Sequence, residues 1–339
     1  MSKKGTAQFW DTAHRYLGHQ LKVIRQDSSH TIDSYRDCLN SFIDYLERVE
    51  NISRKKISFH NFGKETIKRY QTWMITEQGL APKTCNLRLT AIRSFLEYAA
   101  QEYLWLMPVY TDACTIAGVK TPNHAIEYFE PDEMTALLAA PSGTSRTDRR
   151  NQMMLIFLYD TAARVAEARQ VKVSDLHLDA GVPYVTLLGK GRKYRNIPLM
   201  EKTVLHLKRY LKDFHGSDPK TDLPLFYAKA HGLLHELSSD TFEKMIKRYA
   251  EQCREGGYPM PDRVHCHMIR KTRAMDLYRE GVPLPHIQQL LGHENISTTS
   301  GFYAFATLDV LAKAMEAVNP DNGVKSWSDP DILERLYRL

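Results

Sequence analysis

Four short segments of the chain carry residue types that act on phosphates. They are TAARVAE with Arg164 and Glu167, GKGRKYR with Lys190, HCHMIRK with His267 and Arg270, and LLGHENISTTSGFY with His293 and Tyr303. Fixed cationic donors stabilise the negative charge that spreads over the non-bridging oxygens of a phosphodiester in its transition state. A phenol is a weak nucleophile at neutral pH and needs a base and cations beside it. Together the segments predict a phosphodiester site in which Tyr303 is the nucleophile.

Each segment alone also has a purely structural interpretation. Arg164 lies in an apolar run, three residues before Glu167, so the two could form an ion pair on one helix face. Lys190 could be a solvated hairpin tip, although its flanking glycines would let the backbone approach a neighbouring groove. Tyr303 could be a core aromatic. Only the combination of the four segments favours chemistry.

Further basic residues are candidates for contacts with the phosphates of a polyanionic partner. They are Lys83, Arg88, Arg93, Arg192, Lys193, Arg195 and Lys271. For any one of those in the helical N-terminal part, a solvated helix face is an equally good interpretation.

A metal site is disfavoured. His265, Cys266 and His267 are adjacent, but side chains at i and i+2 of a helix point apart, and no acidic or histidine partner follows nearby. Phosphate-binding loops and the HExxH and GxSxG motifs are missing from the sequence. We therefore expect no metal and no cofactor.

Composition agrees with a polyanionic partner. The 339 residues carry a formal net charge of +6, with a pI near 8.9. The five cysteines are scattered without a CxxC pair, which suits a reducing compartment. The N-terminal residues do not form a signal peptide, and apolar runs are too short to span a membrane. We expect a soluble cytoplasmic protein that does not associate with membranes.

Hydrophobic periodicity predicts a mainly α protein with a small antiparallel β-sheet. Helical patterns occupy 31–49, 63–75 and 84–100, and a Gly-Pro-Asn segment at 115–126 separates them from a second part. In that part, runs at 184–188 and 194–198 flank Gly-Lys-Gly and predict a hairpin, while helices precede and follow it.

The four motifs, in this order, resemble those of the tyrosine recombinases (phage integrase family), of the Xer-like or transposon-encoded two-domain type. The resemblance implies an N-terminal helical core-binding domain at 1–115, a linker at 116–127, and an α+β catalytic domain at 128–318. A tail at 319–339 would be a subunit-contacting or regulatory addition.

The resemblance also implies a role for each motif residue. Arg164 and Arg270 would clamp the scissile phosphate, Glu167 would position that site, Lys190 would protonate the departing 5′ oxygen, His267 would exchange a proton with Tyr303, and His293 would support the phosphate. Tyr303 would form a 3′-phosphotyrosyl bond, and strand exchange would pass through a Holliday junction. The implied partners are double-stranded recombination sites, a homotetramer on DNA, and accessory DNA-bending proteins.

The chain departs from the family pattern at three places. Lys271 follows the arginine where a second histidine is usual, and Ala162 and Ala163 replace the common glycine before Arg164. The gap before Tyr303 is one residue longer, which would rotate a continuous helix by about 100°, and Gly301 is where we expect the backbone to absorb it. A type IB topoisomerase and a DNA-binding protein that has lost cleavage are the alternatives. The target sequence, and the choice between integration or excision of a mobile element and dimer resolution, stay open.

Overall fold

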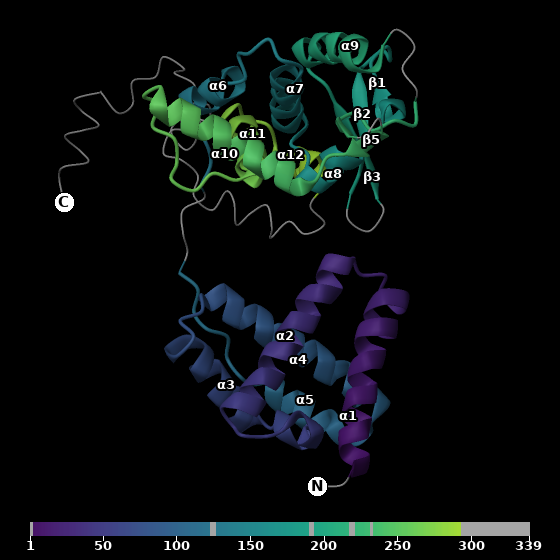
Figure 1. The fold of residues 1–339 in the computed structure, drawn as a ribbon, viewed down its shortest axis with the longest axis vertical. Helices are drawn as coiled ribbons and strands as arrows, with labels where there is room; N and C mark the ends of the chain where they lie inside the picture. Colours follow the sequence, from purple (N-terminus) through teal and green to yellow (C-terminus); the bar gives the residue numbers. More distant parts are fainter. Residues whose placement is uncertain (1–2, 123–126, 190–192, 217–220, 231–232, 293–339) are drawn as a thin grey trace, which may run out of the picture. The chain divides into compact units, whose positions relative to one another are not determined.

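The computed structural model describes residues 3–122, 127–189, 193–216, 221–230 and 233–292 (Figure 1). Its contacts divide the chain into an N-terminal unit, Met1–His124, and a C-terminal unit, Ala125–Leu339. The division lies inside the segment 116–127 for which the sequence predicts a linker.

The described part of the N-terminal unit is built of helices, as predicted. They are α1 (Lys3–Arg15), a π-helical stretch (Tyr16–Ile24), α2 (Ser29–Arg48), α3 (Lys64–Thr76), α4 (Pro82–Glu102) and α5 (Met107–Cys114), with 3₁₀ turns at Arg54–Lys56, Phe59–Phe62 and Leu104–Leu106. Ser28 begins α2 by accepting a hydrogen bond from the Thr31 backbone N–H, and Pro82 begins α4, where its missing N–H costs nothing. The helices enclose an aromatic core that includes Phe9, Phe42 and Phe95.

Three polar side chains of the N-terminal unit form hydrogen bonds with the end of α5 and the chain that follows it. The Asn86 amide donates to the Val119 carbonyl (2.9 Å) and accepts from the Val119 N–H (2.8 Å). Gln71 donates to the Ala117 carbonyl at 2.9 Å. Arg93 donates to the carbonyls of Ala113 and Ile116. The first residues of the predicted linker therefore belong structurally to the N-terminal unit.

The C-terminal unit combines helices with two small antiparallel sheets. Its elements are α6 (Pro131–Ala139), α7 (Arg146–Thr161), α8 (Val165–Gln170), a 3₁₀ turn (Val173–Asp175), β1 (Leu176–His177), β2 (Tyr184–Leu188), β3 (Tyr194–Pro198), α9 (Glu201–His215), β4 (Tyr227–Ala230), β5 (Leu233–Glu236), α10 (Ser239–Glu255), α11 (Cys266–Arg279) and α12 (Leu284–Leu291). Strands β1, β2 and β3 form one sheet in that order, and β4 pairs with β5. The hairpin strands β2 and β3 coincide with the predicted runs, whereas the β4–β5 hairpin was not predicted.

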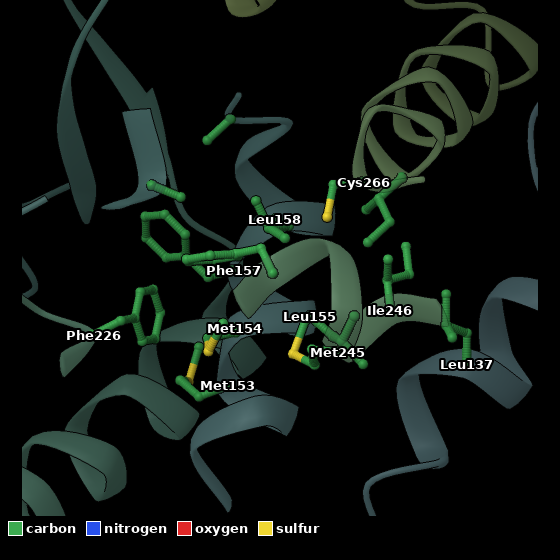
Figure 2. Close-up of a cluster of buried hydrophobic side chains, with 14 of the residues drawn as sticks. Leu137, Met153, Met154, Leu155, Phe157, Leu158, Phe226, Met245, Ile246 and Cys266 are labelled. Carbon is green, nitrogen blue, oxygen red and sulfur yellow. The ribbon is translucent and has the colours of Figure 1, made fainter. Parts of the chain in front are cut away.

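Helix α7 supplies much of the core of this unit. It contacts α9 and α11, and its buried side chains include Met154, Leu155 and Phe157 (Figures 1 and 2). Phe157 meets Phe226 edge to face with ring centroids 5.5 Å apart. Cys266 also lies in this cluster (Figure 2), so the first turn of α11 is held by the core. The mainly helical architecture with small antiparallel sheets confirms the predicted fold class.

Among the described helices, none is long and apolar enough to cross a membrane.

Candidate active site

A sharp break between α7 and α8 brings Arg164 to the start of a helix. Ala162 ends α7 in the left-handed conformation (φ 49°) and is fully buried. Thr161 stabilises the turn, because its hydroxyl accepts a hydrogen bond from the Ala163 N–H at 3.2 Å and donates to the Phe157 carbonyl at 2.6 Å. Glycine tolerates positive φ better than alanine, which gives a physical reason for the glycine that is common in this motif. The chain between Arg146 and Gln170 therefore forms two helices, α7 and α8.

Glu167 is the centre of the polar cluster. Its carboxylate is 4% exposed and accepts hydrogen bonds from the backbone N–H and the guanidinium of Arg164, both at 2.8 Å. Both terminal nitrogens of Arg195 donate to the same carboxylate, at 2.8 and 2.7 Å. One buried carboxylate therefore fixes two guanidiniums.

The ionised form of Glu167 is strongly favoured. Burial alone would raise the pKa of this carboxyl, but the hydrogen bonds and charge of Arg195 and the hydrogen bonds from Arg164 outweigh burial and lower the pKa to about 2. Glu167 is consequently charged throughout the neutral range.

Arg270 is buried and lies next to the turn at Ala162. Its side chain comes from α11, is 2% exposed, and donates to the Ala162 carbonyl at 2.7 Å and to the Leu291 carbonyl. Burial, followed by the positive charge of Arg164, lowers the pKa of Arg270 to about 9, which leaves it protonated at neutral pH. Burying a cation is costly unless charge or hydrogen bonds compensate it, and a bound anion would reduce that cost.

Three successive carbonyls at the end of α12 meet three different arginines. The Leu290 carbonyl accepts from Arg195 Nε at 3.1 Å, the Leu291 carbonyl from Arg270, and the Gly292 carbonyl from Arg164 at 3.5 Å. Gly292 ends the helix in the left-handed conformation (φ 60°). Elements from four parts of the sequence, α8, β3, α11 and α12, therefore converge on one cluster.

His267 lies one turn before Arg270 on α11, and its side chain reaches solvent. Partial burial of the ring, then the charges of Arg270 and Lys271, lower its pKa to about 4. The imidazole is therefore neutral at physiological pH and can accept a proton. Lys271 is half-buried beside it.

The side chains of His265, Cys266 and His267 occupy different environments. No group of three or more potential metal ligands occurs within the described residues. His265 lies just before α11, and its ring is nearly parallel to that of His267, with the ring centroids 6.4 Å apart. Cys266 points into the core, where burial raises the pKa of its thiol.

The base of the β2–β3 hairpin lies next to Glu167. The Gly189 N–H donates to the Lys193 carbonyl at 2.8 Å, and Lys193 is exposed. The tip residues Lys190 and Arg192, and also His293 and Tyr303, lie outside the described residues.

The other predicted DNA contacts occupy different environments. Lys83 is exposed in the first turn of α4, and Arg88 is half-buried beside Tyr70. Arg93 holds backbone carbonyls at the end of the N-terminal unit, as described above. Arg195 belongs to the Glu167 cluster and is only 13% exposed. Its engagement there is the feature that the sequence did not indicate.

Comparison with known proteins identifies the family of this chain. Residues 127–307 match the sequence profile described as "Phage integrase family", and residues 14–103 match "Phage integrase, N-terminal SAM-like domain". The chain belongs to the phage integrase family. This family member is therefore a tyrosine recombinase, an enzyme that transfers DNA strands at specific sites.

Curated relatives of this recombinase match it over most of its length. It is 30% identical over 314 residues to a putative integrase/recombinase, y4rC, of Sinorhizobium fredii, covering 92% of each chain. It is 33% identical over 285 residues to tyrosine recombinase XerD of Halalkalibacterium halodurans, covering 83% of this chain and 89% of the relative. These relatives do not favour the topoisomerase alternative.

Solved structures share its fold. The XerH site-specific recombinase bound to a palindromic difH substrate, in a post-cleavage complex, aligns with a TM-score of 0.65 at 21% identity over 86% of this chain and 81% of that chain. A lambda integrase tetramer bound to a Holliday junction aligns with a TM-score of 0.62 at 18% identity over 86% of this chain and 76% of that chain.

Proposed function

We propose that this recombinase cuts and rejoins DNA through Tyr303, with Arg164 and Arg270 binding the scissile phosphate. The observation that carries the proposal is the convergence of these two arginines on the turn at Ala162 and the end of α12, where Glu167 fixes Arg164. Guanidiniums fixed before the substrate arrives need no reorganisation as charge develops on the phosphate.

In the proposed cleavage step, the Tyr303 oxygen bonds to phosphorus while the bond from phosphorus to the 5′ oxygen breaks. The phenolic proton passes to His267, and Lys190 protonates the departing 5′ oxygen. The neutral state of the His267 imidazole supports its role as acceptor. The negative phosphate raises the pKa of a neighbouring imidazole, which suits return of the proton during rejoining.

The 3′-phosphotyrosyl bond conserves the energy of the broken phosphodiester, so the cycle requires no ATP. Attack by the 5′-hydroxyl of another strand releases Tyr303 and exchanges strands, and two rounds pass through a Holliday junction. We assign His293 to support of the phosphate and Glu167 to positioning of Arg164.

For the assembly, we propose two double-stranded sites held by a homotetramer in the cytoplasm, with accessory DNA-bending proteins as additional partners. The lambda integrase tetramer with the same fold supports the tetramer. Lys83, Arg88, Lys193, Lys271 and the hairpin tip residue Arg192 are proposed phosphate contacts. We propose a core-binding part that includes the first residues of the predicted linker, through Val119, and a catalytic part at 128–318, with 319–339 contacting a neighbouring subunit.

The test is a suicide substrate, a duplex that contains the recombination site and a nick beside the scissile phosphate, so that the short 5′ product diffuses away. We expect the wild-type protein to form a covalent adduct that migrates slowly in denaturing gels, and Tyr303→Phe to bind the same duplex without forming it. Specific binding by the wild type without an adduct would instead support a DNA-binding protein that has lost cleavage.

A further inference from the structure

Arg195 lies too deep in the Glu167 cluster for an ordinary phosphate contact. Its side chain is 13% exposed, and three of its N–H groups donate, two to Glu167 and one to the Leu290 carbonyl. Paired, parallel hydrogen bonds between a guanidinium and a carboxylate are strong and fix the orientation of both groups.

Two glycines enclose the Arg195 side chain. A Cβ atom added at Gly189 would lie 3.2 Å from Arg195 Nη1. A Cβ atom added at Gly292 would lie 3.1 Å from Arg195 Cδ and 3.2 Å from Nη1. These separations are shorter than ordinary carbon contacts. The glycine of GKG and the glycine of LLGH thus leave room for the same guanidinium.

Arg195 connects elements that carry the proposed catalytic groups. Through Glu167 it supports Arg164 at the start of α8, and through the Leu290 carbonyl it supports the end of α12, where Arg270 and Arg164 also bind. It belongs to β3, the strand that leaves the hairpin of Lys190.

We infer that Arg195 is a positioning residue for strand cleavage, which holds Glu167 and the end of α12 in the arrangement that presents Arg164 and Arg270 to the scissile phosphate. The inference rests on the proposed function. Arg195 acts through Glu167 and the Leu290 carbonyl and does not bind the DNA backbone itself.

The test separates positioning from phosphate binding. Arg195→Lys keeps the charge but cannot span both carboxylate oxygens, and Arg195→Met removes the charge at similar length. The control is Arg209→Ala, which removes an exposed positive charge on α9, away from this cluster. For each protein, cleavage of the suicide substrate is timed at saturating DNA, and binding of the same duplex is measured at several salt concentrations.

We expect both Arg195 variants to cleave about 10- to 100-fold more slowly, the range in which outer-shell partners of a reactive site commonly act. The slope of log affinity against log salt should stay at the wild-type value, because no phosphate contact is lost. A residue that neutralises one phosphate would reduce the slope by about 0.9. Arg209→Ala should cleave at the wild-type rate.

Three results would overturn the inference. They are normal cleavage by Arg195→Met, a salt slope reduced by about 0.9 in Arg195→Met but not in Arg195→Lys, which keeps the charge, and loss of cooperative unfolding in both variants, which would assign Arg195 to stability alone. The wild-type reaction separates this inference from the proposed function. If the wild-type protein forms no adduct, the proposed role of Tyr303 is refuted. If the wild type forms the adduct and the Arg195 variants form it equally fast, only the role of Arg195 is refuted.

Discussion

Replacing Glu167 by glutamine should destabilise the cluster by an amount that follows from its pKa. The folded protein lowers the pKa of this carboxyl from 4.5 to about 2, and each pKa unit corresponds to about 1.4 kcal/mol. The ionised carboxylate of this 4% exposed side chain therefore contributes about 3 kcal/mol at pH 7. The same magnitude is typical when one partner of a buried ion pair is removed.

The sign of the pH dependence is fixed by the lowered pKa. Stabilisation by Glu167 is fully present above pH 4.5 and is lost as the pH falls toward about 2, because the unfolded chain takes up its proton first. Glu167→Gln lacks this contribution at every pH. The difference in stability between wild type and variant should be about 3 kcal/mol at pH 7 and less than half of that at pH 3.

The assay must report on the C-terminal unit. Trp10, Trp73 and Trp105 belong to the N-terminal unit, so tryptophan fluorescence would follow mainly the wrong part of the chain. Hydrogen exchange of peptides from α8 and α12 at pH 7 is suitable, and we expect about a hundredfold faster exchange in Glu167→Gln. Urea unfolding followed by circular dichroism at pH 7 and pH 3 supplies the pH comparison.

Glu236→Gln is the matched control, since Glu236 is exposed on β5 and lies outside the cluster. It should leave exchange in α8 and α12 unchanged. The predicted contribution of Glu167 would be refuted if Glu167→Gln exchanges as slowly as the wild type at pH 7, or if its stability depends on pH in the same way as that of the wild type.

Four further predictions concern other residues. Arg270→Ala should slow adduct formation at saturating DNA by at least about a hundredfold, as for loss of a transition-state donor, and a near-normal rate would contradict the clamp. Because the pKa of His267 is lowered to about 4, the folded protein should lose stability as the pH falls from about 6.5 toward 4. His267→Gln should therefore show a smaller drop in melting temperature between pH 7 and pH 5 than the wild type. An equal drop in the two proteins would contradict the lowered pKa of His267. Ala162→Gly should stay within about 1 kcal/mol of the wild type in urea unfolding, whereas Ala162→Val should cost about 2 kcal/mol or more, because a branched side chain is strained at positive φ; equal stability of the two would refute this. Arg93→Ala should speed tryptic cleavage after the exposed Lys120 by about tenfold, as expected if the lost hydrogen bonds of Arg93 contribute about 1.4 kcal/mol to holding this segment in place. The salt slope of DNA binding should not change.

Local patterns predicted the elements well, because the determining interactions are local. The runs at 184–188 and 194–198, on either side of Gly-Lys-Gly, predicted β2 and β3 with their observed bounds. The β4–β5 hairpin was missed, since Leu233–Glu236 is exposed at every position and lacks the alternation of a half-buried strand.

The candidate site was predictable in part. The spacing of Arg164 and Glu167 indicated an ion pair, and the structure has one at 2.8 Å. Sequence reasoning placed Arg195 among the DNA contacts, because a run of basic residues gives no sign that one of them meets a carboxylate from another part of the chain. The left-handed turn at Ala162 was equally hidden, since alanine rarely adopts that conformation.

The carboxyl ends of α7 and α12 hold the guanidinium of Arg270 in position without a bound phosphate. Each helix ends in a left-handed residue and turns its last carbonyls toward arginines. The carboxyl end of a helix carries a partial negative charge, and here two such ends face Arg270. The guanidinium can therefore stay in position before a phosphate arrives and after it leaves. Repeated cutting and rejoining of strands would then begin each time from the same prepared arrangement.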